Sequence, residues 1–248
     1  MAYYKLRKNG TVVRVRANGV YDPGILKAIF MAGGPGSGKS FTTGELFGVP
    51  RGLLYTTTAA SGLKLVNTDP AFEHYLKREG IDPADLGTLS PEDFALVTEG
   101  PLSPRGKAKS VVSKLRESWL RGRLGIIWDG TGDDYDKIKK RRARLEALGY
   151  DTYMVFVNTS LKVSQERNAA RPRKLPAKLV KKIWTHVQEN MGRFQALFGA
   201  ANMIIVDNTV YGPIPGEIKK AANSFMRRPL ENPIGKKWVA DELAKKRR

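Results

Sequence analysis

The chain has 248 residues, a length that suits one large domain or one domain with appendages. It contains 43 Lys and Arg against 24 Asp and Glu, so its formal net charge is +19. The absence of cysteine excludes a disulfide scaffold or disulfide partner, a thiolate zinc site and a cysteine nucleophile. No apolar run approaches the ~20 residues of a membrane helix, and the first ten residues lack the apolar stretch of a secretory signal. We therefore expect a cytoplasmic protein with no membrane partner.

The order of apolar and polar residues predicts an α/β protein. Two β-branched runs around Asn9-Gly10 predict a basic β-hairpin. Further along, strands are expected at residues 25–32, 63–68, 124–128, 152–157 and 202–206. The helices between and after them are expected at residues 39–48, 70–79, 107–121, 135–148, 161–170, 177–198, 216–226 and 237–246. This alternation indicates a three-layer α/β/α fold with a mostly parallel five-stranded sheet. The expected division is a hairpin at 1–20, a P-loop domain at 21–208 and a basic helical C-terminal tail at 209–248.

A glycine-rich segment directly after the first of these five strands fits the pattern G-x-x-x-x-G-K-[ST]. Its residues are Gly33, Gly34, Pro35, Gly36, Ser37, Gly38, Lys39 and Ser40. The glycines allow backbone N–H groups to point inward, and the following helix presents its positive end to phosphates. Lys39 is expected to reach the β- and γ-phosphates of ATP, and the Ser40 hydroxyl to bind Mg²⁺. The alternative is an ordinary glycine-rich turn between a strand and a helix.

Two aspartates follow predicted strands at the edge of the sheet that usually binds ligands. Asp69 ends the motif Asn67-Thr68-Asp69 and could accept the proton of an attacking hydroxyl group. Alternatively, Asp69 caps the helix that begins at Pro70. Asp129 follows an apolar strand as a Walker B carboxylate does, and could hold Mg²⁺ directly or through water. Its alternative role is that of a turn residue at the end of a strand.

Three arginines, Arg167, Arg171 and Arg173, lie near a predicted helix end that is bounded by prolines. A mobile lid that supplies arginine to a transferring phosphoryl group has this composition. The planar guanidinium suits the task because it binds phosphate through two parallel hydrogen bonds. The alternative is a solvated basic turn.

The order of these four elements resembles the zeta-toxin and polynucleotide-kinase-like group of P-loop kinases. The similarity covers roughly residues 25–206 and extends to phage-encoded 5-hydroxymethyluracil DNA kinases. The resemblance implies that Lys39 and Ser40 bind ATP with Mg²⁺, that Asp69 is the base, and that Asp129 is linked to the metal. It implies contacts of Arg167, Arg173 and Arg171 with the phosphates. It also implies the host cytoplasm as the location if the chain is phage-encoded.

The charge distribution bears on the acceptor of the phosphoryl group. Residues 137–182 hold fourteen basic and three acidic side chains, whereas residues 65–99 hold eight acidic and two basic ones. Such basic excess favours nucleic acid, most simply DNA, as the substrate. The acceptor would be a hydroxymethylated base or a 5′-OH end. Phe72 and Tyr75 could face such a base or pack in the core. One alternative is a kinase of a nucleotide sugar or other small metabolite, and another is a non-catalytic nucleic-acid-binding protein.

Overall fold

The computed structural model describes residues 2–6, 12–16, 25–50, 56–171 and 174–245. Its main sheet has five strands in the order β4-β5-β3-β6-β7, and each of its four pairings is parallel. The strands are β3 (Lys27–Ala32), β4 (Lys64–Val66), β5 (Ile126–Asp129), β6 (Asp151–Asn158) and β7 (Met203–Asp207). The expected fold is confirmed. Because the chain moves from one side of β3 to the other, a ligand crevice is expected at the C-terminal end of this central strand.

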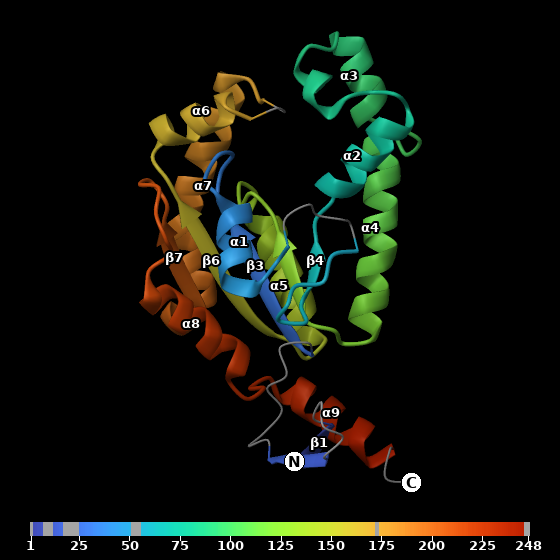
Figure 1. Ribbon diagram of the computed structural model, residues 1–248, viewed down its shortest axis with the longest axis vertical. Helices are drawn as coiled ribbons and strands as arrows, with labels where there is room; N and C mark the ends of the chain where they lie inside the picture. Colours follow the sequence, from blue (N-terminus) through green and yellow to red (C-terminus); the bar gives the residue numbers. More distant parts are fainter. Residues whose placement is uncertain (1, 7–11, 17–24, 51–55, 172–173, 246–248) are drawn as a thin grey trace.

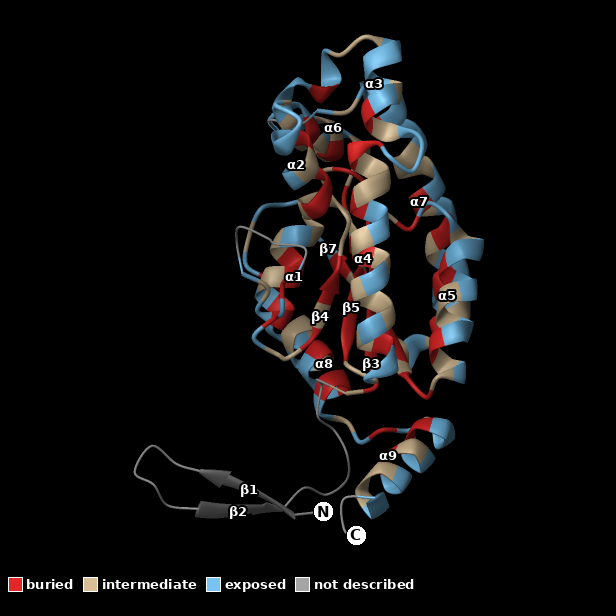
Figure 2. Ribbon diagram, turned by 90° about the vertical axis from the view of Figure 1, so that its right-hand side faces the viewer, coloured by how far each residue is buried: buried red, intermediate tan, exposed pale blue. Residues whose placement is uncertain are grey.

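Helices cover both faces of the sheet (Figure 1). One face carries α1 (Lys39–Phe47) and α8 (Gly216–Arg227), and the other carries α4 (Pro104–Arg121), α5 (Tyr135–Ala147) and α7 (Ala177–Phe198). Side chains alternate between the two faces along β3: Ile29 and Met31 belong to the first core and Phe30 to the second. The buried residues therefore form two layers on either side of the sheet, as Figure 2 shows in red.

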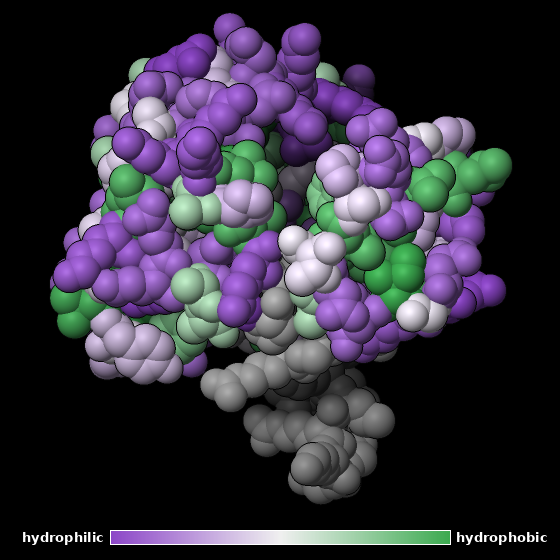
Figure 3. All heavy atoms as spheres, turned by 90° about the horizontal axis from the view of Figure 1, so that it is seen from above, coloured by the Kyte–Doolittle hydropathy of each residue, from purple (hydrophilic) through white to green (hydrophobic). Residues whose placement is uncertain are grey.

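Two groups of helices rise beyond the C-terminal ends of the strands (Figure 1). One comprises α2 (Asp69–Arg78), the 3₁₀ turn η1 (Pro83–Gly87) and α3 (Pro91–Thr98); the other comprises α6 (Leu161–Ala169) and the start of α7. Seen from above, a hollow rimmed largely by hydrophilic side chains lies between the two groups (Figure 3). The loop between β3 and α1, which carries the predicted P-loop, lies at the same end of the sheet (Figure 1).

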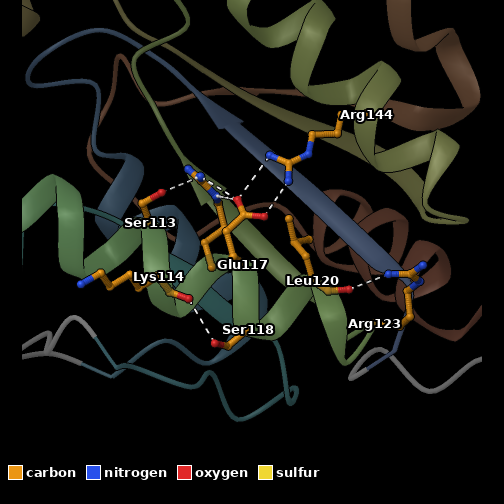
Figure 4. Close-up of polar contacts among 8 residues, drawn as sticks. Ser113, Lys114, Glu117, Ser118, Leu120, Arg123 and Arg144 are labelled. Carbon is orange, nitrogen blue, oxygen red and sulfur yellow. Dashed lines mark hydrogen bonds and ion pairs between the residues drawn. The ribbon is translucent and has the colours of Figure 1, made fainter.

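Helix α4 begins at Pro104, three residues before the predicted start. Ser103 accepts a hydrogen bond from the Gly106 N–H at 2.9 Å, and the following proline suits a first helical position. Further along, Glu117 of α4 accepts hydrogen bonds from Arg144 of α5, as Figure 4 shows. These contacts join α4 to α5, while the buried Ala108 and Val112 pack the first half of α4 against the core.

A hairpin lies near the N-terminal end of the chain, and two helices lie near the C-terminal end. The predicted hairpin is confirmed as an antiparallel pair of β1 (Ala2–Leu6) and β2 (Val12–Arg16), while its connection at residues 7–11 lies outside the described residues. Near the other end of the chain, the short 3₁₀ turn η2 (Ala200–Asn202) precedes β7, and α8 and then α9 (Pro233–Lys245) follow β7. Phe225 of α8 is part of the core. Asp151 accepts hydrogen bonds from the backbone of Glu231 and Asn232. The division into three parts stays a prediction.

Across the described ranges, we find no helix whose length and apolar character would let it cross a membrane.

Candidate functional site

The loop between β3 and α1 has the backbone form that its sequence predicts. Gly36 and Gly38 have φ angles of 73° and 85°, in the left-handed region that glycine adopts readily. A Cβ atom on Gly36 would lie 2.4 Å from the Ser164 carbonyl oxygen. Lys39 donates a hydrogen bond from its Nζ to the Gly33 carbonyl at 2.6 Å, so the ammonium folds back over the loop. The loop can therefore receive phosphates on backbone N–H groups beside a cation.

Two side chains that the sequence analysis did not single out hold this loop from outside. Ser164 of α6 donates a hydrogen bond to the Pro35 carbonyl at 2.6 Å. Asn208, which follows β7, donates from Nδ2 to the Ser37 carbonyl at 2.7 Å. The only signal in the sequence is that Asn208 is a polar residue directly after a strand that ends at this edge. Arg167, a predicted phosphate ligand, donates from NH1 to the Asn208 carbonyl at 2.8 Å and so lies beside the loop.

We expect Asn208→Ala to destabilise the protein and weaken nucleotide binding. The substitution leaves the Ser37 carbonyl buried without its donor, which typically costs about 1–3 kcal/mol. Chemical denaturation should show this loss, and titration with ATP should show a raised Kd. Asn202→Ala is the matched control, because Asn202 bonds Arg228 on the opposite side of the domain. An unchanged denaturation midpoint in Asn208→Ala would contradict the assigned contact.

Burial and several charged side chains shift the pKa of Lys39. Burial lowers the pKa of its ammonium, and Arg171 acts in the same direction. Asp129, Asp69 and Asp133 oppose this decrease and favour the charged form. The structure thus brings the predicted lysine, both predicted carboxylates and one predicted arginine within electrostatic reach of one another.

The side chain of Asn67 connects the Asp129 carboxylate to the backbone of Asp69. Asn67 donates from Nδ2 to Asp129 Oδ2 at 2.8 Å and accepts a hydrogen bond from the Asp69 N–H at 2.8 Å. Asp69 is the first residue of α2, and Thr68 occupies the cap position, so Asp69 is not the N-cap itself. Asn67 belongs to the motif Asn67-Thr68-Asp69, but the sequence assigned it no role. The structure shows that it joins the ends of β4 and β5.

Asp129 has the properties of a cation ligand. Burial raises the pKa of its carboxyl group, and the charge of Asp69 adds to this, while Lys39 and the Asn67 hydrogen bond oppose it. Its Oδ1 is buried and has no hydrogen-bond partner among the described residues. A carboxylate oxygen with a free lone pair fits Mg²⁺, and the exposed Ser40 hydroxyl at the start of α1 is a second oxygen of suitable type. Among the described residues there is no group of three or more His, Asp or Glu side chains that would hold a metal without help from phosphates.

Arg105 is a site residue that the sequence analysis did not find. Its NH1 lies 3.0 Å from Asp69 Oδ1, and its guanidinium carbon lies 4.9 Å from the centroid of the Phe72 ring. Phe72 is buried in the core, which is the second of its two expected roles. The only local signal was a basic residue at a capped helix start, which occurs on many solvated helices.

The predicted lid is placed in part. Arg171 is exposed at the end of α6, whereas Arg173 lies outside the described residues. Asn168 holds the bend from within: its side chain donates to the Leu175 carbonyl at 2.8 Å and accepts from the Leu175 N–H at 3.1 Å. The roles of the three arginines toward phosphate stay predictions.

Residues 29–197 match the model of a protein family that is described as the AAA domain. No curated protein matches the chain. Among solved structures, a chain from the PezAT toxin–antitoxin system of Streptococcus pneumoniae is 16% identical over 89% of this chain and 84% of that one, with a TM-score of 0.45. A gluconokinase from Sinorhizobium meliloti is 17% identical over 90% and 98% of the two chains, with a TM-score of 0.38. A shikimate kinase from Acinetobacter baumannii is 15% identical over 89% and 95%, with a TM-score of 0.37. Similarity at this level transfers neither a substrate nor a partner.

Proposed function

Because the chain belongs to the AAA domain family, whose match includes the whole P-loop, we propose that it is an ATP-dependent phosphotransferase with a hydroxyl group as acceptor. One observation carries the proposal: Asn67 links the Asp129 carboxylate to the backbone of Asp69, and both aspartates favour the charged form of Lys39. A carboxylate beside a P-loop lysine but outside the loop can serve a second substrate.

The proposed reaction uses each group at one point. The backbone of residues 33–38 and the Lys39 ammonium bind the phosphates of ATP. Ser40 and Asp129 would hold Mg²⁺, which, when bound, withdraws charge from the phosphate oxygens. As the acceptor oxygen attacks the γ-phosphorus, its proton passes to the Asp69 carboxylate. The bond between the γ-phosphorus and the bridging oxygen breaks, and ADP leaves with the electron pair.

The predicted lid arginines have a place in the same proposal. Negative charge accumulates on the oxygens of the transferring phosphoryl group and on the departing ADP. Arg167 already lies beside the P-loop through its bond to the Asn208 carbonyl, and Arg171 already affects Lys39. Together with Arg173, they are suited to stabilise this charge through paired N–H groups.

For the acceptor, we propose nucleic acid, most simply DNA carrying a hydroxymethylated base such as 5-hydroxymethyluracil, or a 5′-OH end. The support is the net charge of +19 together with its placement on the surface. In the part of the chain that the structure describes, Lys137, Lys139 and Lys140 of α5 are exposed and form no ion pair with a carboxylate. Uncompensated lysines of this kind attract a phosphate backbone.

A small phosphorylated metabolite, such as a nucleotide sugar, is the second candidate. The observation that favours it is the acidic arm α2–η1–α3, which stands beside the crevice and carries most of the eight acidic residues of 65–99. These charges repel a polyanion more strongly than a compact substrate. The two candidates therefore differ in the size and total charge of the acceptor and not in the reaction.

Transfer of labelled γ-phosphate from ATP tests both candidates. The panel contains 5′-OH oligonucleotides, hydroxymethylated DNA, free nucleosides and UDP-N-acetylsugars. We expect label in the nucleic acid, with a rate that falls steeply with salt because several phosphates are neutralised on binding. Label found only in the nucleotide sugar would overturn the nucleic-acid proposal, and transfer to no hydroxyl would overturn the phosphotransferase proposal.

A further inference from the structure

We propose that the seam between α4 and α5 binds the phosphodiester backbone of a polynucleotide, with one phosphate against the guanidinium groups of Arg116 and Arg141. The seam lies on the face of the sheet that carries α4, α5 and α7, whereas α1, which follows the P-loop, covers the other face. It is therefore a second anion site, separate from the groups of the proposed reaction. The inference rests on the proposed function only in assuming that the acceptor is a polynucleotide.

The guanidinium group of Arg141 rests on an aromatic ring and has no acceptor. Its carbon lies 4.3 Å from the centroid of the Trp128 ring, and the guanidinium carbon of Arg116 in α4 lies 5.4 Å from the same centroid. Trp128 is 9% exposed, so the ring is a fixed support for both cations. Within the described part of the chain, Arg141 forms neither a hydrogen bond nor an ion pair, so its N–H groups are left for water or an anion.

The two guanidinium groups over Trp128 repel each other. Burial lowers the pKa of Arg141, and the charge of Arg116 lowers it further, whereas Asp134 favours the charged form. Glu117 accepts hydrogen bonds from the Nε and NH2 of Arg116, which leaves NH1 of that residue without a partner among the described residues. A phosphate group can bind this NH1 and the planar fork of Arg141 together, because it offers more than one oxygen. Its negative charge would relieve the repulsion between the two cations.

Further cations extend the seam along α5. Lys137, Arg141 and Arg144 follow one another at intervals of four and three residues, so they lie on one stripe of the helix. The stripe is about 10 Å long, the axial length that holds about three phosphates of one DNA strand. Lys137 is exposed, and the half-exposed Arg144 pairs with Glu117 of α4, as Figure 4 shows. Glu117 thus joins the two helices, and the seam keeps an excess of positive charge.

The side chains of the seam favour a polynucleotide over other large anions. A membrane-binding helix combines cations with exposed apolar side chains. Among the described residues, no exposed large apolar side chain lies on α4 or α5. Arginine binds phosphate through paired N–H groups, and the regular row of phosphates in a nucleic acid suits cations on successive helix turns. An acidic polypeptide presents carboxylates without this row and therefore serves as the competitor in the experiment.

Arg141→Gln and Arg141→Lys test the site, with Arg227→Gln as the matched control. Arg227 is an exposed arginine of α8 on the other face of the sheet, so its replacement removes the same charge elsewhere. Because Arg141 has no hydrogen bond to lose within the described chain, its variants should keep the denaturation midpoint of the wild type. The probes are unmodified oligonucleotides with a 5′-phosphate, single-stranded and duplex, which lack the proposed acceptor groups. Fluorescence anisotropy measures their Kd between about 50 and 200 mM salt.

Arg141→Gln should weaken binding by about 10- to 100-fold, the usual value of a charge-assisted contact, and should reduce the salt dependence by about one phosphate contact. Arg141→Lys should keep the salt dependence and recover only part of the affinity, because lysine keeps the charge and lacks the planar fork. Arg227→Gln should resemble the wild type. Equal weakening in Arg141→Gln and Arg227→Gln would overturn the inference. So would a wild type that binds no oligonucleotide at low salt, or one that prefers polyglutamate or phosphatidylserine vesicles.

Transfer of labelled γ-phosphate separates this inference from the proposed function. If both hold, Arg141→Gln raises the KM for DNA and leaves kcat at saturating DNA unchanged, because the seam lies outside the crevice. Arg141-dependent binding without transfer to any hydroxyl would support the seam and overturn the proposed function. Transfer to nucleic acid with the same KM in Arg141→Gln and the wild type would support the proposed function and overturn the inference.

Discussion

Replacing Asp69 by Asn is expected to lower kcat by about 10²- to 10⁴-fold, the range typical of a general base. The amide keeps the size of the side chain and cannot take the proton of the acceptor hydroxyl. The backbone N–H of Asp69 still bonds Asn67, so the link to Asp129 survives the change. ATP affinity should therefore remain within a few-fold of the wild type. The measurements are kcat with saturating acceptor and the Kd of ATP.

Glu73→Gln is the matched control for this prediction. Glu73 lies on the same helix α2, and the change also replaces a carboxylate by an amide. Its kcat should equal that of the wild type. If Asp69→Asn retained full turnover, Asp69 would not be the base. If neither the wild type nor Asp69→Asn transferred phosphate, and both bound nucleic acid equally, the result would favour a non-catalytic nucleic-acid-binding protein.

Replacing Lys39 by Met should lower kcat/KM by about 10²- to 10³-fold, the effect of removing one donor from a preorganised charged site. The Nζ is folded onto the Gly33 carbonyl at 2.6 Å, at the point where the loop would receive phosphate. Burial lowers the pKa of this ammonium, and the three aspartates around it counteract that shift. Methionine keeps the length of the side chain but provides neither the charge nor the N–H groups.

Lys219→Met is the comparison for Lys39→Met. Lys219 of α8 pairs with Glu45 of α1 at 2.9 Å, so its replacement changes the charge near the same helix but outside the loop. Steady-state kinetics with varied ATP should leave this control unchanged. A kcat/KM for Lys39→Met within a few-fold of the wild type would show that the loop does not act on the transferring phosphate.

Much of the site could be predicted from local sequence. The P-loop pattern determines its own geometry, because Gly36 and Gly38 adopt φ angles that few other residues tolerate. Asp69 and Asp129 could be predicted to meet because parallel strands end at one edge of the sheet. The signals that start a helix are equally local: Ser103 caps α4 and Pro104 is its first residue, so the helix begins three residues before the predicted start.

The partners of these residues could not be predicted in the same way. Arg105 meets Asp69 across 36 positions and Asn208 meets Ser37 across 171. Neither lies in a recognisable motif, and each is one of many residues of its type. Which arginine faces a carboxylate depends on the angle between α2 and α4, and the packing of both helices against the sheet sets that angle.

The fold class, the glycine-rich loop and the places of the two carboxylates after strands follow from short segments of sequence, because periodicity, glycine conformation and strand ends are local properties. The contacts between these groups depend on tertiary packing: Asn67 links the Asp129 carboxylate to the backbone of Asp69, Asn208 holds the loop, and Arg105 pairs with Asp69. Such contacts require side chains from distant segments within about 3 Å of each other, a spacing that only the packed core can impose.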